Sequence, residues 1–259
     1  MNRFGLADHL RTSNPVDKVG FIQDRCRGRV VLDLGCIRHS ALVALTDPRW
    51  LHGKIRDVAG RLIGIDYLGP DVERLRNEGY DIRCQDVTRP LELECSFDVI
   101  VAADLIEHLA CFEAFFSNCD RLLKEDGILI ITTPNPFYVD EFWFVALKGE
   151  YLMNPEHTCW IDPYSLSLLS ARYGFAIEDA RFIQGSWRFH DLALEGEGHE
   201  LDILKNRWVE ETRMQEITRH AVAGILWPAC AVTRLGSALT RYSDYVMVLR
   251  KGSPEAHPG

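Results

Sequence analysis

Three short apolar runs that each end in an acidic residue constrain the fold of this 259-residue chain most strongly. They cover residues 30–36, 62–66 and 97–104 and carry Asp33, Asp66 and Asp104. Continuous apolar runs of this length are typical of strands buried on both faces, and such strands form parallel sheets covered by helices. Ligands of open parallel sheets bind at the carboxyl ends of the strands. The three acids are therefore expected to meet at one crevice, suited to the hydroxyls and amine of a nucleoside.

Charge and cysteine content exclude several classes of protein. The formal net charge of −9 disfavours nucleic-acid binding through a broad basic face. The eight cysteines include no Cys-x-x-Cys pair, which indicates reduced thiols rather than disulfides or a zinc site. Residues 1–12 lack a signal-peptide core, and no apolar stretch is long enough to span a bilayer. We therefore expect a cytoplasmic protein without a transmembrane segment; peripheral membrane contact stays open.

Strand and helix patterns alternate along most of the chain. Strands are expected at residues 29–34, 61–65, 80–84, 97–102, 128–132, 175–183 and 245–249. Helices are expected at residues 14–27, 40–45, 50–59, 70–78 and 111–123, and from Asp162-Pro163 to Gly174. The first of these helices would begin with Asn14 as its cap and Pro15 in its first turn. This alternation predicts an α/β fold with a doubly wound sheet and right-handed crossovers.

Five segments in this order resemble the motifs of class I S-adenosylmethionine-dependent methyltransferases, in particular the type 11 and type 12 small-molecule group. The segments are Asp33-Leu34-Gly35-Cys36, Asp66, and residues 85–87, 103–109 and 122–130. The resemblance covers about residues 29–183. It implies a Rossmann-like, seven-stranded methyltransferase sheet, transferase activity and S-adenosyl-L-methionine as the cofactor.

The resemblance divides the chain into five parts. Residues 1–28 would be an N-terminal helical segment, and residues 29–190 the methyltransferase core that binds the cofactor. Residues 191–242 would form a helical insertion or cap between strands six and seven. Residues 243–251 would be the last core strand, followed by a disordered tail at 252–259.

The resemblance also implies which residues bind the cofactor. Asp33 and Gly35 would hold the methionine end, Asp66 the ribose, and Asp86 with Val87 the adenine. One acid at the end of a strand is as readily a helix cap, but three at one edge favour ligand binding. The expected set is Asp33, Gly35, Cys36, Ile37, Asp66, Tyr67, Asp86, Val87, Ala103 and Asp104.

The loop after the first strand departs from the family pattern of three alternating glycines. The second and third glycine positions are Ile37 and His39. A β-branched residue such as Ile37 tolerates neither positive φ nor crowding. We therefore expect the loop to follow a different path, or the cofactor to sit differently. Residues 50–55 account for the unusually long spacing from Gly35 to Asp66.

Two histidines are candidates for catalysis. A hydroxyl acceptor needs a base to take its proton, and histidine suits that role near neutral pH. His108 lies just after the fourth strand, and His157 lies in the segment between the fifth strand and the next helix. The alternative for His108 is a role at a helix start or against the cofactor, and for His157 a hydrogen bond to backbone. His52 is expected to be a structural histidine.

Other features allow weaker conclusions. No His, Asp or Glu group has metal-ligand spacing, so no metal is expected unless Asp104, Asp140, Glu141 and Glu156 approach one another in the fold. The aromatic residues within 137–144 suit a core or a lid over a substrate. The apolar run 221–232 suits a packed helix or a dimer contact better than a membrane interface.

The predicted function is methyl transfer to a small-molecule acceptor, most simply an oxygen of a sugar, a glycolipid or a natural-product intermediate. The oligomeric state stays open. The alternative is a non-catalytic, methyltransferase-like scaffold, which the missing glycines favour and the retained acids oppose. A nicotinamide-dependent oxidoreductase is disfavoured because the loop at residues 35–40 lacks the glycines that cradle a phosphate.

Overall fold

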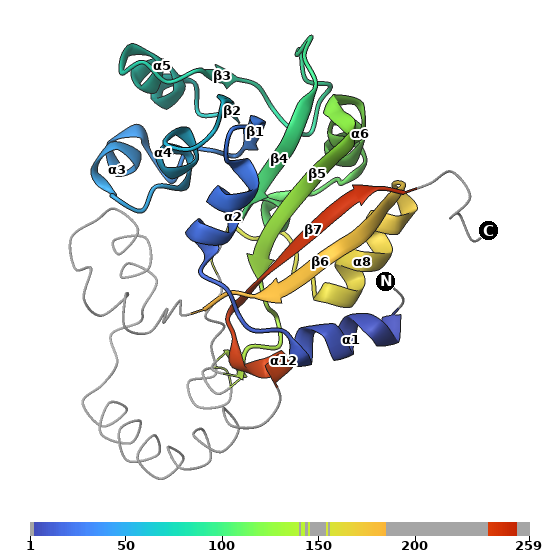
Figure 1. Cartoon of the computed structure of the whole chain (residues 1–259). Helices are drawn as coiled ribbons and strands as arrows, with labels where there is room; N and C mark the ends of the chain where they lie inside the picture. Colours follow the sequence, from blue (N-terminus) through green and yellow to red (C-terminus); the bar gives the residue numbers. More distant parts are fainter. Residues whose placement is uncertain are drawn as a thin grey trace, which may run out of the picture.

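The apolar runs form the central strands of a seven-stranded sheet flanked by helices (Figure 1). The computed structural model describes residues 3–139, 141, 142, 145, 154, 156–184 and 238–252. The strands are β1 (Val30–Leu34), β2 (Arg61–Asp66), β3 (Ile82–Cys84), β4 (Phe97–Ala103), β5 (Leu123–Pro134), β6 (Phe175–Phe182) and β7 (Asp244–Lys251). The helices are α1 (Arg3–Thr12), α2 (Lys18–Cys26), α3 (Ala41–Thr46), α4 (Leu51–Arg56), α5 (Gly69–Asn77), η1 (Ile106–His108), α6 (Glu113–Leu122), α8 (Pro163–Arg172) and α12 (Ala238–Arg241).

The strand order is β3-β2-β1-β4-β5-β7-β6. All neighbouring strands are parallel except β7, which runs antiparallel to both β5 and β6. The chain starts in the middle at β1, proceeds to the edge at β3, and then crosses back to β4 on the other side of β1. This reversal is the point at which open α/β sheets bind ligands. The predicted fold class is confirmed.

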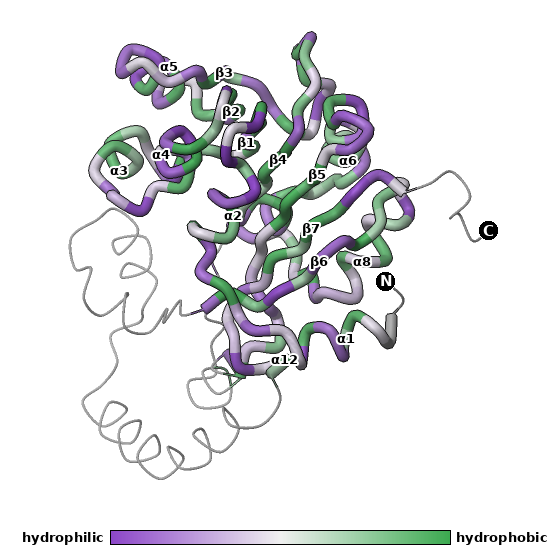
Figure 2. The backbone as a smooth tube through the Cα atoms, viewed as in Figure 1, coloured by the Kyte–Doolittle hydropathy of each residue, from purple (hydrophilic) through white to green (hydrophobic). Residues whose placement is uncertain are grey.

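Alternation along each strand assigns its side chains to two cores. Leu32, Ile100 and Leu129 belong to the core that includes Phe115 of α6 and Leu166 of α8. The residues next to them on the strands belong to the other core, which packs against α2 and α4. That core contains Val31, Val99, Ile130, Ile22, Cys26 and Ile55. The central strands are accordingly the most hydrophobic part of the backbone trace (Figure 2).

Two elements begin several residues away from the expected position. The helix predicted from Asn14-Pro15 begins only at Lys18, because Val16 is extended and pairs with Ile183 beside β6. Asp17 provides the cap instead, accepting a hydrogen bond from the N–H of Gly20. The fifth strand was expected from Ile128 but begins at Leu123. The pairing of β5 with β4 shifts register there, so the turn residues lie within the strand.

Several expectations fall on residues outside the described ranges. The insertion at 191–242 is described only from Ala238 onward, and the apolar run 221–232 and most of the tail lie outside. Every cysteine in the described part of the chain is a free thiol, as expected. Within the same part of the chain, no helix combines the length and the apolar character needed to cross a membrane.

Candidate active site

The loop after β1 lies directly against the residue that follows Asp104. Gly35 has a φ of 68°, and a Cβ at this position would lie 2.9 Å from Cδ1 of Leu105. Its N–H donates to the carbonyl of Ile65 at 2.8 Å. Only glycine fits both the left-handed backbone and this close approach. The carboxyl ends of β1 and β4 therefore meet at Gly35 and Leu105.

The two non-glycine positions of this loop behave differently. Ile37 does not have a positive φ, and its buried side chain belongs to a small core with Ala41 and Val72. His39 has a φ of 56° and so takes the left-handed conformation itself. Histidine is among the residues that tolerate this region better than β-branched ones. The loop thus keeps one left-handed turn beyond Gly35 without a second glycine.

Residues of the long spacer brace the loop from outside. The indole Nε1 of Trp50 donates to the carbonyl of Cys36 at 2.7 Å, and the Trp50 ring contacts the ring of Tyr80 at 4.9 Å. Burial, and then the nearby charge of Asp33, raises the pKa of the Cys36 thiol well above its usual value. Cys36 therefore stays protonated and supports the loop by packing and through its backbone carbonyl.

Asp66, the acid expected at the ribose, is 5% exposed and bound to the same loop. Its Oδ2 accepts the N–H of Ile37 at 2.9 Å, and its Oδ1 accepts the N–H of Leu68 at 3.2 Å. Burial raises the pKa of Asp66, while these backbone donors act in the opposite direction. Tyr67, the next residue, is 74% exposed.

Asp33, the acid expected at the methionine end, is 3% exposed. Its Oδ2 lies 2.8 Å from Nδ1 of His52 on α4, and His52 is buried as well. His52 is thus a structural histidine, as expected. At least one carboxylate oxygen of Asp33 is engaged inside the protein, between β1 and α4.

Asp86 and Val87 follow β3 and are fastened to α6. Asp86 accepts hydrogen bonds from the side chain and the N–H of Thr88, and these lower the pKa of Asp86. The carbonyl of Val87 accepts from Nδ2 of Asn118 at 3.1 Å. The segment expected at the adenine is therefore held by contacts that leave Asp86 partly accessible.

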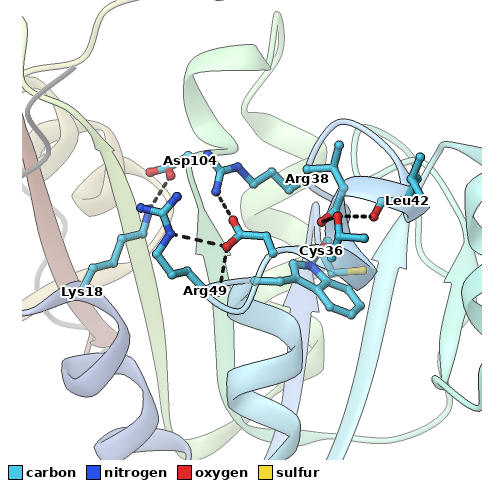
Figure 3. A network of polar contacts seen from close by, with 10 residues as sticks. Lys18, Cys36, Arg38, Leu42, Arg49 and Asp104 are labelled. Carbon is cyan, nitrogen blue, oxygen red and sulfur yellow. Dashed lines mark hydrogen bonds and ion pairs between the residues drawn. The ribbon is translucent and has the colours of Figure 1, made fainter. Parts of the chain in front are cut away.

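Ala103 ends β4, and Asp104 follows it with a φ of 50°. The Asp104 carboxylate accepts a hydrogen bond from Thr132 Oγ1 at 2.8 Å and forms an ion pair with Lys18 at the start of α2 (Figure 3). Figure 3 also shows Arg38 and Arg49 beside this ion pair; both bind the carboxylate of Asp47. Basic side chains from three segments thus surround the loop and the end of β4.

The two predicted catalytic histidines lie together, although the chain separates them widely. The rings of His108 and His157 are in edge contact with centroids 4.7 Å apart. Nδ1 of His108 lies 3.2 Å from the carbonyl of Glu156. A carbonyl only accepts, so Nδ1 carries the proton, and Nε2 of the neutral ring is an acceptor. Thr158 fastens the His157 segment to η1: its N–H donates to the Glu107 carbonyl at 2.8 Å.

Glu107 completes this cluster and was not among the predicted site residues. Its side chain is 1% exposed, and Oε2 accepts a hydrogen bond from Thr133 Oγ1 at 2.9 Å. Oε1 is buried with no hydrogen-bond partner among the described residues. Burial, and then the charge of Asp104, raises the pKa of Glu107. The adjacent His108 was the available signal, but sequence alone does not distinguish an inward acid from a helix-start residue.

Donor atoms of Glu107, His108 and His157 lie within 4.8 Å of one another. The acids for which sequence left a metal site open are arranged differently. Asp104 is paired with Lys18 and Glu156 contributes its backbone carbonyl, while Asp140 lies outside the described ranges. The structure thus brings a buried carboxylate and two imidazoles together: Glu107 and His108, just beyond the end of β4, and His157 from the segment before α8.

Comparisons with known proteins identify the family. Residues 8–180 match a family model described as a methyltransferase domain. A probable S-adenosylmethionine-dependent methyltransferase of Mycolicibacterium smegmatis is 30% identical over 205 residues, covering 78% of this chain and 68% of that protein. A ubiquinone biosynthesis O-methyltransferase of Coxiella burnetii is 28% identical over 158 residues, covering 59% of this chain and 64% of the relative.

Solved structures agree on the fold. A SAM dependent methyltransferase from Archaeoglobus fulgidus has a TM-score of 0.52 at 16% identity, covering 97% of this chain and all of that one. The family model spans most of the chain, and this favours an enzyme over the scaffold alternative. The chain therefore belongs to the S-adenosylmethionine-dependent methyltransferases, enzymes that use S-adenosylmethionine as their cofactor.

Proposed function

We propose that this methyltransferase transfers the methyl group to an oxygen of a small molecule, such as a sugar, a glycolipid or a natural-product intermediate. The observation that carries the proposal is the cluster of Glu107, His108 and His157 just beyond β4. Leu105 links this cluster to the loop of Gly35, so acceptor chemistry and cofactor loop are neighbours. The similarity to an O-methyltransferase also supports oxygen as the acceptor atom.

The acids at the strand ends offer acceptors that suit the hydroxyls and the amine of the cofactor. Asp66 would receive the ribose hydroxyls, because a carboxylate oxygen can accept a second hydrogen bond beside the one from the loop. Asp86 would face the adenine amine, with the exposed ring of Tyr67 and Val87 as apolar neighbours. Asp33 would act indirectly, by holding α4 against β1 through His52.

When bound, S-adenosylmethionine supplies a methyl group on a sulfonium: the acceptor oxygen bonds to that carbon, the carbon–sulfur electron pair stays on sulfur, and the hydroxyl proton is released. The protein's own task is then to position the acceptor and assist the loss of that proton. His108 presents Nε2 for this purpose, since Nδ1 is bound to the Glu156 carbonyl. His157 lies against the same ring.

Exposed aromatic side chains support an acceptor with an apolar part. Phe137 and Phe142, in the segment that follows β5, are 58% and 63% exposed. Thr133, which holds Glu107, lies four residues before Phe137. We propose that this aromatic segment contacts the rest of an acceptor whose hydroxyl lies at the cluster. This arrangement favours a glycolipid or an aromatic natural product over a free sugar.

The first experiment is a calorimetric titration of the protein with S-adenosylhomocysteine. We expect micromolar binding by the wild type and binding weakened about tenfold or more, about 1.4 kcal/mol, by Asp66→Ala. The exposed acid Asp81 provides the control, and Asp81→Ala should bind as the wild type does. Absence of binding by the wild type would contradict the proposed cofactor site.

The acceptor atom needs a separate measurement. Labelled S-adenosylmethionine is incubated with a panel of hydroxyl and amine compounds, and the products are analysed by mass spectrometry. We expect the label in a methyl ether. A relative named pavine N-methyltransferase, 26% identical over 104 residues, makes nitrogen the second candidate. Label found only on nitrogen would rule out the oxygen proposal.

A further inference from the structure

We propose that Glu107, His108 and His157 form a site for one divalent transition-metal ion of the zinc type, which binds the acceptor oxygen. The role of the ion rests on the proposed function, whereas the site itself rests on the three side chains alone. One donor atom from each lies within 4.8 Å of the other two. Tetrahedral zinc with bonds of about 2.0–2.1 Å needs donors about 3.4 Å apart, which modest side-chain rotations provide.

A second observation points to a ligand at this place. Oε1 of Glu107 is buried without a hydrogen-bond partner among the described residues, and the side chain is 1% exposed. A buried carboxylate oxygen of this kind is unfavourable unless a cation or a donor compensates it. The other oxygen, Oε2, is held by Thr133, and a hydrogen bond of this type orients a metal-binding carboxylate. A cation between Glu107 and the histidines would satisfy the free oxygen.

The histidines are supported as metal ligands usually are. His108 gives its Nδ1 proton to the backbone carbonyl of Glu156, which leaves Nε2 of the neutral ring unprotonated, in its metal-binding form. Thr158 is bonded to η1 and to the residue that follows it: its Oγ1 donates to the carbonyls of Glu107 and Leu109 at 3.1 and 3.0 Å. His157, the residue before Thr158, is thereby kept beside His108.

The ligand set selects the kind of ion and its role. Two imidazoles and one carboxylate suit Zn²⁺ and other first-row metals, whereas Mg²⁺ and Ca²⁺ prefer oxygen ligands. Three protein ligands leave a coordination position for a substrate oxygen. An ion there lowers the pKa of the bound acceptor hydroxyl, whose proton then passes to water. The two histidines would thus assist proton loss through the ion rather than as free bases.

The test uses the full chain after dialysis against a chelator. It is titrated with Co²⁺ followed by visible absorption, and then with Zn²⁺ in competition. We expect one equivalent per chain, and affinity weakened about tenfold or more in Glu107→Gln and His108→Ala. His9→Gln is the control, because His9 binds Asp179 on β6 and is not part of the cluster, and glutamine can keep the bond to Asp179. Glutamine at position 107 retains an acceptor for Thr133; if it misfolds, His157→Ala replaces it.

The outcomes separate this proposal from the proposed function. S-adenosylhomocysteine binding is measured on the same samples and should be unchanged in the cluster variants. No metal bound by the wild type, or equal binding by wild type and cluster variants, overturns the metal site. Metal binding without S-adenosylhomocysteine binding would instead leave the site intact and remove the proposed function.

Discussion

Two buried aspartates at the ends of neighbouring strands differ in what surrounds them. Asp66 binds backbone N–H groups of the loop after β1 and of the residues that follow β2. Asp33 binds the side chain of His52. A buried carboxylate is stable only when it is hydrogen-bonded, so each acid fixes a local conformation. Asp66 fixes the loop at Ile37, and Asp33 fixes α4 against β1.

The pair of Asp33 and His52 provides a test at the residue scale. His52→Ala leaves the Asp33 carboxylate buried without its donor, which should lower the free energy of unfolding by about 3 kcal/mol. His52→Asn places an amide N–H near the position of Nδ1 and should recover more than half of the loss. Urea unfolding of the three proteins measures the difference. Equal stability of the alanine and asparagine variants would show that packing, not the hydrogen bond, matters.

At the scale of elements, α2 connects the far edge of the sheet with the crevice. Before the helix, the N–H of Val16 donates to the carbonyl of Phe182, the last residue of β6, at 2.9 Å. At the start of the helix, Lys18 reaches the Asp104 carboxylate. Ile22 and Cys26 pack against the sheet further along. The position at which α2 begins therefore decides whether Lys18 faces Asp104.

The cap of α2 is testable by itself. Asp17→Ala removes the acceptor for the Gly20 N–H and should lower the free energy of unfolding by about 1 kcal/mol. Asp17→Ser retains a capping oxygen and should lie close to the wild type. Thermal unfolding compares the three proteins. A serine variant as unstable as the alanine variant would mean that the charge of Asp17, rather than its capping bond, is what matters.

At the scale of the whole molecule, the carboxylate of Asp179 joins α1 and α2 to β6. Asp179 on β6 accepts from His9 Nε2 on α1 at 2.9 Å and from Arg25 on α2 at 3.3 Å. Arg181, two residues along the same strand, donates to it as well. His9 and Arg25 are both distant from Asp179 in the chain, so their contacts with it form only when the complete fold is assembled.

Asp179 predicts a dependence of stability on pH. Burial alone would raise the pKa of Asp179, but the hydrogen bonds from His9 and Arg181 prevail and lower it. A carboxyl group whose pKa is lowered by folding stabilises the fold at pH values above its pKa in the unfolded chain, about 3.9. This stabilisation is lost as the pH falls through the pKa of the group in the folded state. Asp179→Asn should therefore cost about 1–2 kcal/mol at pH 7, and the gap to the wild type should close below about pH 4.

Chemical denaturation between pH 7 and pH 2.5 measures this gap. Asp8→Asn is the matched control, because Asp8 is exposed and pairs only weakly with Arg11 one turn away. A gap for Asp179→Asn that stays constant down to the lowest pH would contradict the assignment of the effect to the charged carboxylate.

The strands themselves follow from local sequence. Runs of apolar residues such as 97–102 predict buried strands. The short apolar run near Tyr245 likewise predicts the last strand, β7. The acids at strand ends mark the crevice for the same reason, because parallel strands end at one edge. The predicted start of α2 was wrong, because a bridge to Ile183, far along the chain, holds Val16 extended. Periodicity carries no information on such a contact.

Sequence by itself determined the layers, the acids at the strand ends and the family, since these depend on hydrophobic periodicity and on short motifs. Only the tertiary structure decided which groups meet: Asp33 with His52, Ile37 with the Asp66 carboxylate, and His108 with His157. Each pair joins residues from different elements. Their approach depends on the packing of the folded chain, and the distance between two residues in sequence does not reveal it.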